Sequence, residues 1–88
     1  MEKLFCVYMM ASGKRGTLYT GVTSNLVNRV QQHRTHAIEN SFTDRYDVTI
    51  LVWFEQHERA ETAILREKRI KNWRRAWKVE LIQQTNPT

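Results

Sequence analysis

A chain of 88 residues, 41% hydrophobic and 26% charged, has the apolar content for one compact core and the composition of an ordinary globular protein. This excludes a disordered or collagen-like chain, and no apolar run approaches the ~20 residues that a membrane helix needs. The N-terminus lacks a signal-peptide pattern, and the single cysteine, Cys6, excludes an internal disulfide and fits a reducing compartment. We therefore expect one domain over residues 1–88, with its core at about 4–83, in the cytoplasm and not in a membrane.

Two strands are predicted at the start of the chain, over residues 4–11 and 17–23, which are rich in apolar, aromatic and β-branched side chains. The intervening segment 12–16 contains two of the three glycines, so we expect a hairpin turn and antiparallel pairing.

Two tyrosines are expected to meet on one face of this hairpin. A turn centred on Gly13 and Lys14 pairs residues whose numbers sum to 27, which places Tyr8 directly across from Tyr19. Cross-strand aromatic pairs are usually simple packing. Gly21, two residues after Tyr19, keeps the same face open for close approach.

The next elements are a helix, a loop and a third strand. A helix over residues 25–36, capped by Thr23 or Ser24, has an apolar stripe formed by Leu26, Val27, Val30 and Ala37. The polar segment 38–47 is typical of a surface loop. It leads into a hydrophobic strand over 48–55, which suits a central or covered position in the sheet.

Two amphipathic helices follow over residues 58–72 and 73–83, separated by a bend near Asn72. The first has a stripe formed by Ala60, Ala63, Ile64 and Ile70, and the second by Trp77, Leu81 and Ile82. Tryptophans can stack on bases, but the spacing favours core packing for Trp53, Trp73 and Trp77.

Glu67 is the most informative anomaly in the pattern. It follows Ala63 by four residues and precedes Ile70 by three, so helix geometry puts its carboxylate in the middle of the apolar stripe. Desolvating a carboxylate costs several kcal/mol unless a cation or hydrogen bonds compensate. Glu67 therefore needs a metal ion or a basic partner. An ion pair with an arginine at the edge of the core, or a helix turned to place Glu67 at its margin, explains the pattern too.

Arg29 and His33 give a second, weaker indication. They lie four residues apart on one flank of the first helix, so their side chains point in the same direction. A guanidinium suits a phosphate, and an imidazole exchanges a proton near neutral pH. A structural or solvent-facing role is the alternative for this pair.

The basic residues are concentrated near the C-terminal end. The net charge is +5, and eight of the 14 lysines and arginines lie within residues 59–78. Such a cluster favours a polyanionic partner, because each neutralised phosphate releases condensed counterions, and nucleic acid is the commonest soluble polyanion. The solvated face of a helix has the same pattern, so charge alone leaves both interpretations open.

Taken together, the spaced residues resemble the motif of the GIY-YIG nucleases. The motif is carried by Cys6-Val7-Tyr8, ten intervening residues, Tyr19-Thr20-Gly21, and then Arg29, His33 and Glu67. The likeness covers nearly the whole chain and is greatest for small stand-alone bacterial proteins similar to the nuclease domain of the excision-repair endonuclease subunit. It implies an α+β fold, in which a three-stranded antiparallel sheet is flanked by about three helices.

The resemblance also implies roles for the matched residues. Glu67 would hold Mg²⁺ or Mn²⁺, and Arg29 would clamp the phosphate. Tyr8 would help to deprotonate the attacking water, while Tyr19 and His33 would orient water or phosphate. Residues expected to contact nucleic acid are Arg29, Arg66, Lys68, Arg69, Lys71, Arg74, Arg75 and Lys78.

The sequence departs from the family pattern in three places. Cys6 stands where the family usually has glycine, and Thr20 where it has isoleucine, so packing changes more than chemistry. No asparagine aligns with the one that many members place after the glutamate helix, and the candidates to substitute for it are Lys71 and Lys78.

We therefore expect a metal-dependent DNA endonuclease that hydrolyses phosphodiesters with one divalent cation, in DNA repair or recombination. Two alternatives stay open: a nucleic-acid-binding module that kept the fold without activity, and a basic protein-interaction adaptor. A domain this small has little surface for reading bases. Weak sequence preference, or specificity supplied by a protein partner or by homodimerisation, is therefore expected.

Overall fold

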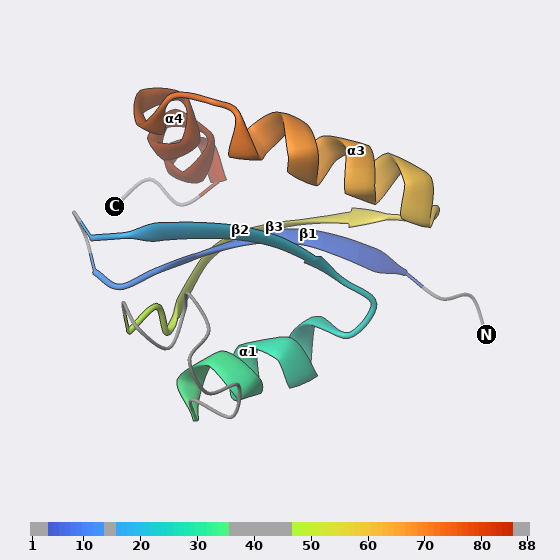
Figure 1. Ribbon diagram of the computed structural model, residues 1–88, viewed down its shortest axis with the longest axis horizontal. Coiled ribbons are helices and arrows are strands. Elements are labelled where there is room, and N and C mark those ends of the chain that lie inside the picture. The colour runs from blue at the N-terminus through green and yellow to red at the C-terminus, as the bar shows by residue number, and fades with distance from the viewer. Residues whose placement is uncertain (1–3, 14–15, 36–46, 86–88) are drawn as a thin grey trace.

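The computed structural model of the chain is built around one antiparallel sheet (Figure 1). It describes residues 4–13, 16–35 and 47–85. The strands are β1 (Phe5–Ala11), β2 (Leu18–Thr23) and β3 (Ile50–His57), and their order in the sheet is β2-β1-β3. Ala37 and all of the predicted loop at 38–47 except Asp47 lie outside the described residues.

Helices cover both faces of this sheet. Helix α1 (Leu26–Arg34) lies on one face, whereas α3 (Ala60–Lys71) and α4 (Arg75–Thr85) lie over the other (Figure 1). The predicted fold class, an antiparallel three-stranded sheet flanked by helices, is confirmed. None of the helices in the described ranges is long and apolar enough to cross a membrane.

The central strand is β1, because its side chains are buried on both faces. Val7 and Met9 pack toward α3, in a cluster that includes Ile70, whereas Tyr8 and Met10 pack on the side of α1. All four of these β1 side chains are fully buried. The third strand was expected to be central or covered, and the second alternative applies: β3 is an edge strand, covered on one face, where Trp53 is buried, whereas Phe54 is exposed.

The hairpin turn is longer than predicted, and this changes the register. Gly16 N–H donates to the carbonyl of Gly13, so the loop spans four residues and not two. Tyr8 consequently pairs with Gly21, while Tyr19 pairs with Met10. The prediction that Tyr8 lies directly across from Tyr19 is therefore wrong. The shift is two residues, so both rings stay on the same face and become diagonal neighbours.

Helix α1 begins at Leu26, one residue later than predicted. The N-cap is Asn25, whose side chain accepts a hydrogen bond from the backbone N–H three residues on, and not Thr23 or Ser24. Val27 is 76% exposed and does not belong to the apolar stripe. Leu26 and Val30 do pack against the core, and His33 is buried on the same side of the helix.

The predicted bend near Asn72 is confirmed, since α3 ends at Lys71 and α4 begins at Arg75. Two side chains assigned to the core are nevertheless exposed: Ile64 by 42% and Trp77 by 51%. The other tryptophans behave as predicted, because Trp53 is buried and Trp73 packs against the same cluster.

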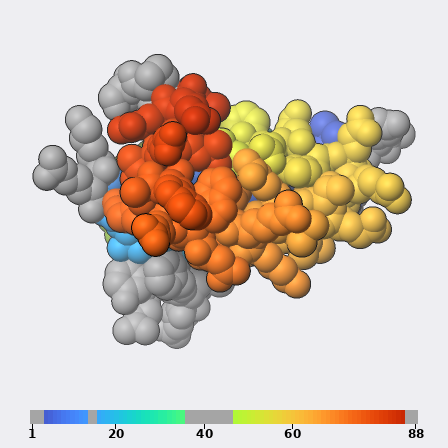
Figure 2. All heavy atoms as spheres, turned by 90° about the horizontal axis from the view of Figure 1, so that it is seen from above, coloured from blue at the N-terminus to red at the C-terminus, as the bar shows by residue number. Residues whose placement is uncertain are grey.

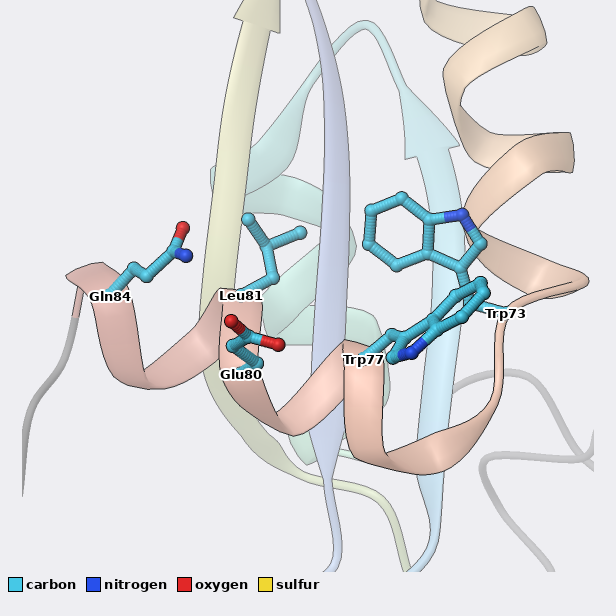
Figure 3. Close-up of a pocket in the computed structure, with 5 residues that line it drawn as sticks. All are labelled: Trp73, Trp77, Glu80, Leu81 and Gln84. Carbon is cyan, nitrogen blue, oxygen red and sulfur yellow. The ribbon is translucent and has the colours of Figure 1, made fainter.

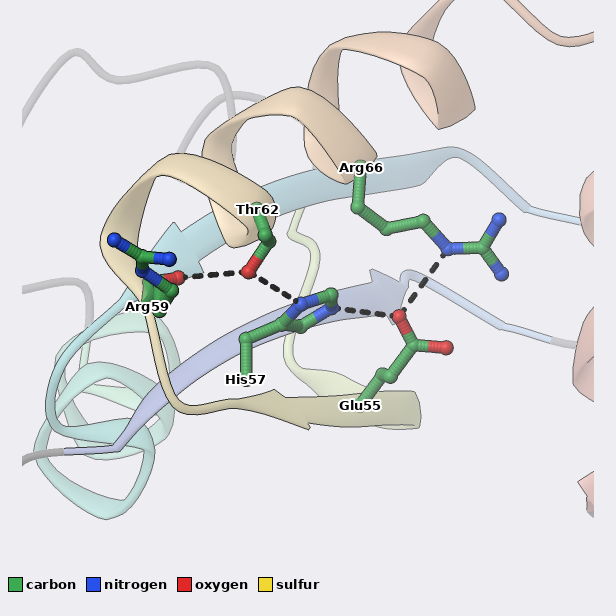
Figure 4. A network of polar contacts seen from close by, with 5 residues as sticks. All are labelled: Glu55, His57, Arg59, Thr62 and Arg66. Carbon is green, nitrogen blue, oxygen red and sulfur yellow. Dashed lines mark hydrogen bonds and ion pairs between the residues drawn. The ribbon is translucent and has the colours of Figure 1, made fainter.

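A polar network fixes the start of α3 to strand β3 (Figure 4). Glu55 Oε1 accepts from Arg66 Nε at 3.2 Å and lies 2.7 Å from His57 Nε2. The other ring nitrogen, Nδ1, lies 3.1 Å from the Thr62 hydroxyl, which donates to the carbonyl of Arg59 at 3.0 Å. These bonds join consecutive turns of the helix to one edge of the sheet, so α3 has a fixed rotation about its own axis.

Candidate active site

Two tyrosines meet on the α1 side of the sheet, and a glycine makes room for them. The ring centroids of Tyr8 and Tyr19 are 6.1 Å apart, with the ring planes inclined by 50°. A Cβ on Gly21 would lie 2.7 Å from the Tyr8 hydroxyl oxygen and 2.9 Å from Tyr19 Cε1. Those distances are shorter than any ordinary van der Waals contact, so the rings occupy the space that a side chain would need. The open face expected at Gly21 is therefore filled by both phenols.

Helix α1 brings an imidazole and a guanidinium to this pair. His33 Nε2 lies 3.2 Å from the Tyr8 hydroxyl, and the His33 ring is 5.5 Å from that of Tyr19. Arg29 Nη1 donates to Gln32 at 3.2 Å, while its Nε is buried with no hydrogen-bond partner in the described part of the chain. His33 and Arg29 lie one helical turn apart, which is why both reach the same site.

Burial and charge set the protonation of these groups. Burial, together with the neighbouring Tyr19, raises the pKa of Tyr8 to about 12, although the Arg29 guanidinium acts in the opposite direction. Burial also lowers the pKa of His33, and the positive charge of Arg29 lowers it further. At neutral pH the site therefore contains a protonated phenol beside a neutral imidazole, which is a hydrogen-bond donor next to an acceptor when the imidazole proton is on Nδ1.

Glu67 is turned inward, as helix geometry predicts. It is 8% exposed, and its nearest cation is the ammonium of Lys71, which lies 2.6 Å from Oε1. Among the described residues this buried oxygen meets no other donor, so its partner is the positive charge of Lys71. The compensating partner is thus a lysine one turn along the same helix, and not the arginine considered from the sequence.

The rotation of α3 turns Glu67 away from Glu55 on β3. Arg66 points toward that residue, at one edge of the sheet. The next residue on a helix is turned by about 100°, so Glu67 points in another direction and is buried beneath the helix. Helix α3 contacts all three strands of the sheet.

The structure therefore divides the predicted site between the two faces of the sheet. Tyr8, Tyr19, Arg29 and His33 are gathered on the α1 face. Glu67 lies on α3, in the layer on the other face.

Apart from Arg29 on α1, the basic residues expected to contact nucleic acid lie on α3, on α4 and between them. Figure 2 shows the face of the molecule that these two helices form. Lys68, Arg69 and Arg75 are exposed. Three others have partners within the protein: Arg66 with Glu55, Lys71 with Glu67, and Arg74 over the ring of Trp77 at 5.8 Å. Lys78 is partly buried.

Two features of this region were not found in the sequence. One is the pairing of Lys71 with Glu67, which the spacing of four residues between an acid and a base could have indicated. The other is the exposed ring of Trp77 beside a surface pocket on α4. An apolar residue at helical spacing carries no signal that distinguishes it from a core residue.

Taken together, the site is a phenol, imidazole and guanidinium cluster on one face of a three-stranded sheet, with a helix on the other face that has an inward carboxylate and basic residues. This combination defines a small α+β domain of the nuclease type. The model of the GIY-YIG catalytic domain matches residues 4–80, so the chain belongs to the GIY-YIG family. This confirms the family resemblance; its members are nucleases that bind nucleic acid and generally depend on a divalent metal.

The relatives of the chain are small proteins of similar length. It is 34% identical over 87 residues to a UPF0213 protein of Syntrophus aciditrophicus (strain SB), a match that covers 99% of this chain and 97% of the relative. It is also similar to the solution NMR structure of the UPF0213 protein BH0048 from Bacillus halodurans, with a TM-score of 0.56 and 25% identity. That match covers 92% of this chain and 84% of the other.

Proposed function

We propose that this protein is a metal-dependent DNA endonuclease that hydrolyses a phosphodiester with one divalent cation. The observation that carries the proposal is the buried contact between the Tyr8 hydroxyl and His33 Nε2, at 3.2 Å, beside the guanidinium of Arg29. A folding role alone would be served as well by phenylalanine and leucine, which need no partner for a buried polar group.

The proton leaves the attacking water through this contact. With a pKa of about 12, Tyr8 does not ionise by itself at neutral pH. His33 is neutral there, because burial and Arg29 lower its pKa, so it can accept the phenolic proton as Tyr8 takes one from a water molecule that has to enter beside the buried hydroxyl. We therefore assign His33 the role of proton acceptor, in place of the orienting role that the family resemblance implies. Tyr19, which is partly exposed, orients the water or the phosphate.

Arg29 and Glu67 would provide the charges for a phosphate that lies across the edge of the sheet, since the two residues belong to opposite faces. The buried Nε of Arg29 has no partner in the described residues, so it has a free donor for a phosphate oxygen. Glu67 fits a divalent cation, since its buried carboxylate is balanced by one ammonium whose place a metal ion could take. In the described residues no group of three or more histidine, cysteine or acidic side chains is placed to hold a metal ion, so Glu67 would be the one protein ligand and water would supply the others, as Mg²⁺ permits. The cation would neutralise charge on the phosphate and the leaving oxygen.

A plasmid-nicking assay with Mg²⁺ or Mn²⁺ tests the proposal. Glu67→Gln should lower the nicking rate more than about 100-fold, whereas Glu61→Gln, an exposed acid on the same helix, should leave it unchanged. Unfolding curves confirm that both variants fold. Nicking that survives Glu67→Gln would come from a contaminant and would refute the proposal. Parallel assays on duplex, branched and RNA substrates show which polymer the protein cleaves, and whether it prefers the branched structures that arise in repair and recombination.

A nucleic-acid-binding module without activity is the second candidate, and the ion pair between Lys71 and Glu67 favours it. The ammonium occupies a position beside the carboxylate where a cation would bind. Binding that weakens steeply with salt, needs no metal and is never followed by cleavage would support this function. If wild-type protein requires a partner chain or a dimer for cleavage, added partner or higher protein concentration will reveal it.

A further inference from the structure

A second candidate site lies on α4, in the layer opposite to the tyrosines (Figure 3). It is a pocket of about 340 Å³ lined by Trp73, Trp77, Glu80, Leu81 and Gln84. The four lining residues on the helix recur every three or four positions and so form one face of α4. No residue of the proposed active site takes part in it.

The aromatic wall of this pocket is held in place from both sides. Arg66 stacks over the ring of Trp73 at 5.3 Å and is itself fixed by its bond to Glu55. The rings of Trp73 and Trp77 meet edge to face, with centroids 6.3 Å apart, and Arg74 lies over Trp77 at 5.8 Å. Trp77 nevertheless keeps 51% of its surface exposed. An indole fixed in this way presents a binding surface without needing to be ordered by its ligand.

The pocket volume and its chemistry select the occupant. A volume of about 340 Å³ is at the lower end of pockets that hold small molecules, and it accommodates one planar group. Glu80 places a carboxylate in the lining, which repels phosphate but accepts hydrogen bonds from an amino group. Gln84 adds an amide that both donates and accepts. The cations, Arg66 and Arg74, stand against the tryptophan rings.

We propose that this pocket binds a single unpaired nucleobase, stacked on Trp77, while Arg74 and its basic neighbours contact the adjoining phosphates. Stacking on an aromatic ring requires the face of a base, which a base pair inside a duplex does not offer. The protein would therefore prefer nucleic acid that carries a single-stranded or opened segment. This inference deepens the proposed function, on which it rests for the identity of the polymer, by naming a class of substrate.

Base-dependent binding can be measured without cleavage. Tryptophan fluorescence of the full chain is titrated, without divalent metal, with a short oligodeoxycytidylate and with an abasic strand of equal length and charge. Stacking should make the first bind about 5- to 150-fold tighter than the second. Trp77→Ala should lower this ratio at least about fivefold and leave the affinity for the abasic strand unchanged. Leu65→Ala is the matched control, because Leu65 has the same 51% exposure on the neighbouring helix.

Two further variants separate stacking from folding. Trp77→Phe keeps a ring, so it should retain part of the ratio that Trp77→Ala loses, and thermal unfolding verifies both. Glu80→Ala should reduce the preference for oligodeoxycytidylate over oligothymidylate, since thymine has no amino group to donate.

The proposal is overturned if Trp77→Ala weakens both strands equally, or changes neither. It is also overturned if sedimentation shows a dimer that Trp77→Ala dissociates, because the pocket would then be an interface between two copies. The outcome is independent of the nuclease proposal. A base-dependent ratio in a protein that cleaves nothing refutes only the endonuclease, and normal nicking with a ratio near one refutes only the pocket.

Discussion

Replacing Gly21 with alanine is expected to disable the tyrosine site by steric means alone. The added Cβ would lie 2.7 Å from the hydroxyl oxygen of Tyr8, 2.8 Å from its Cζ and 2.9 Å from Cε1 of Tyr19. Ordinary contact begins at 3.4 Å, so the Tyr8 hydroxyl has to move by about 0.7 Å. Hydrogen bonds form over a range of only about 0.5 Å, so the bond between Tyr8 and His33 cannot absorb this shift.

The expected result is a loss of about 1–3 kcal/mol in the free energy of unfolding and a fall of about 100-fold in the nicking rate. Chemical denaturation and the plasmid assay measure these two quantities. Gly13→Ala is the matched control, since a Cβ at that position meets no atom of the described residues within 4 Å. In a Tyr8→Phe background the stability loss should shrink, because the closest contact has been removed. A Gly21→Ala protein with wild-type stability and nicking rate would refute this account of the site.

Three further predictions concern charge. The folded protein holds the pKa of His33 below its usual 6.5, so the unfolded state takes up a proton first as the pH falls; the free energy of unfolding should drop below pH 6.5, and denaturation of His33→Gln should lack this drop. Lys71→Met removes the cation beside Glu67, so Mn²⁺ should raise the melting temperature more in this variant than in wild type; an equal rise would show that the ammonium and the metal do not compete. Arg66→Met should lower the free energy of unfolding by about 1 kcal/mol, because it removes the bond to Glu55 and the stacking on Trp73. Urea denaturation measures this change, and an unchanged stability would show that the contact between Arg66 and Glu55 does not hold α3 on β3.

The sequence was sufficient for the elements of the fold, because each has a strong periodic signal. It was insufficient for register and for strand order. The length of a turn decides register, and Gly13 and Gly16 allow a two-residue or a four-residue loop equally well, but only the second matches the observed hydrogen bond. Strand order depends on which strand is covered on both faces, and the hydrophobicity of residues 48–55 did not distinguish an edge strand from a central one.

Part of the candidate site was predictable from local geometry. The inward position of Glu67 and the pairing of Arg29 with His33 follow from a helical period that no distant contact can alter. The sequence could not predict that Glu67 lies on one face of the sheet and Arg29 with His33 on the other, because the face that each helix covers is decided by tertiary packing. Trp77 was wrongly assigned to the core for a related reason. It lies on the apolar face of its helix, but how much of its ring is covered depends on where the sheet lies beneath that helix.

The placement of the two halves of the site leaves little of it free to move. Tyr8 belongs to the central strand and is fully buried. The hydrogen bonds that join β3 to α3 through Glu55 fix the rotation of the helix that carries Glu67. Lys71 is the flexible member, since its side chain is 52% exposed and has a four-carbon stem. For the Glu67 carboxylate to exchange its ion pair for a bound metal cation, only the Lys71 side chain has to turn outward, and the backbone does not have to move. The same turn would carry its ammonium from the carboxylate toward solvent, where the backbone of a bound nucleic acid would attract it.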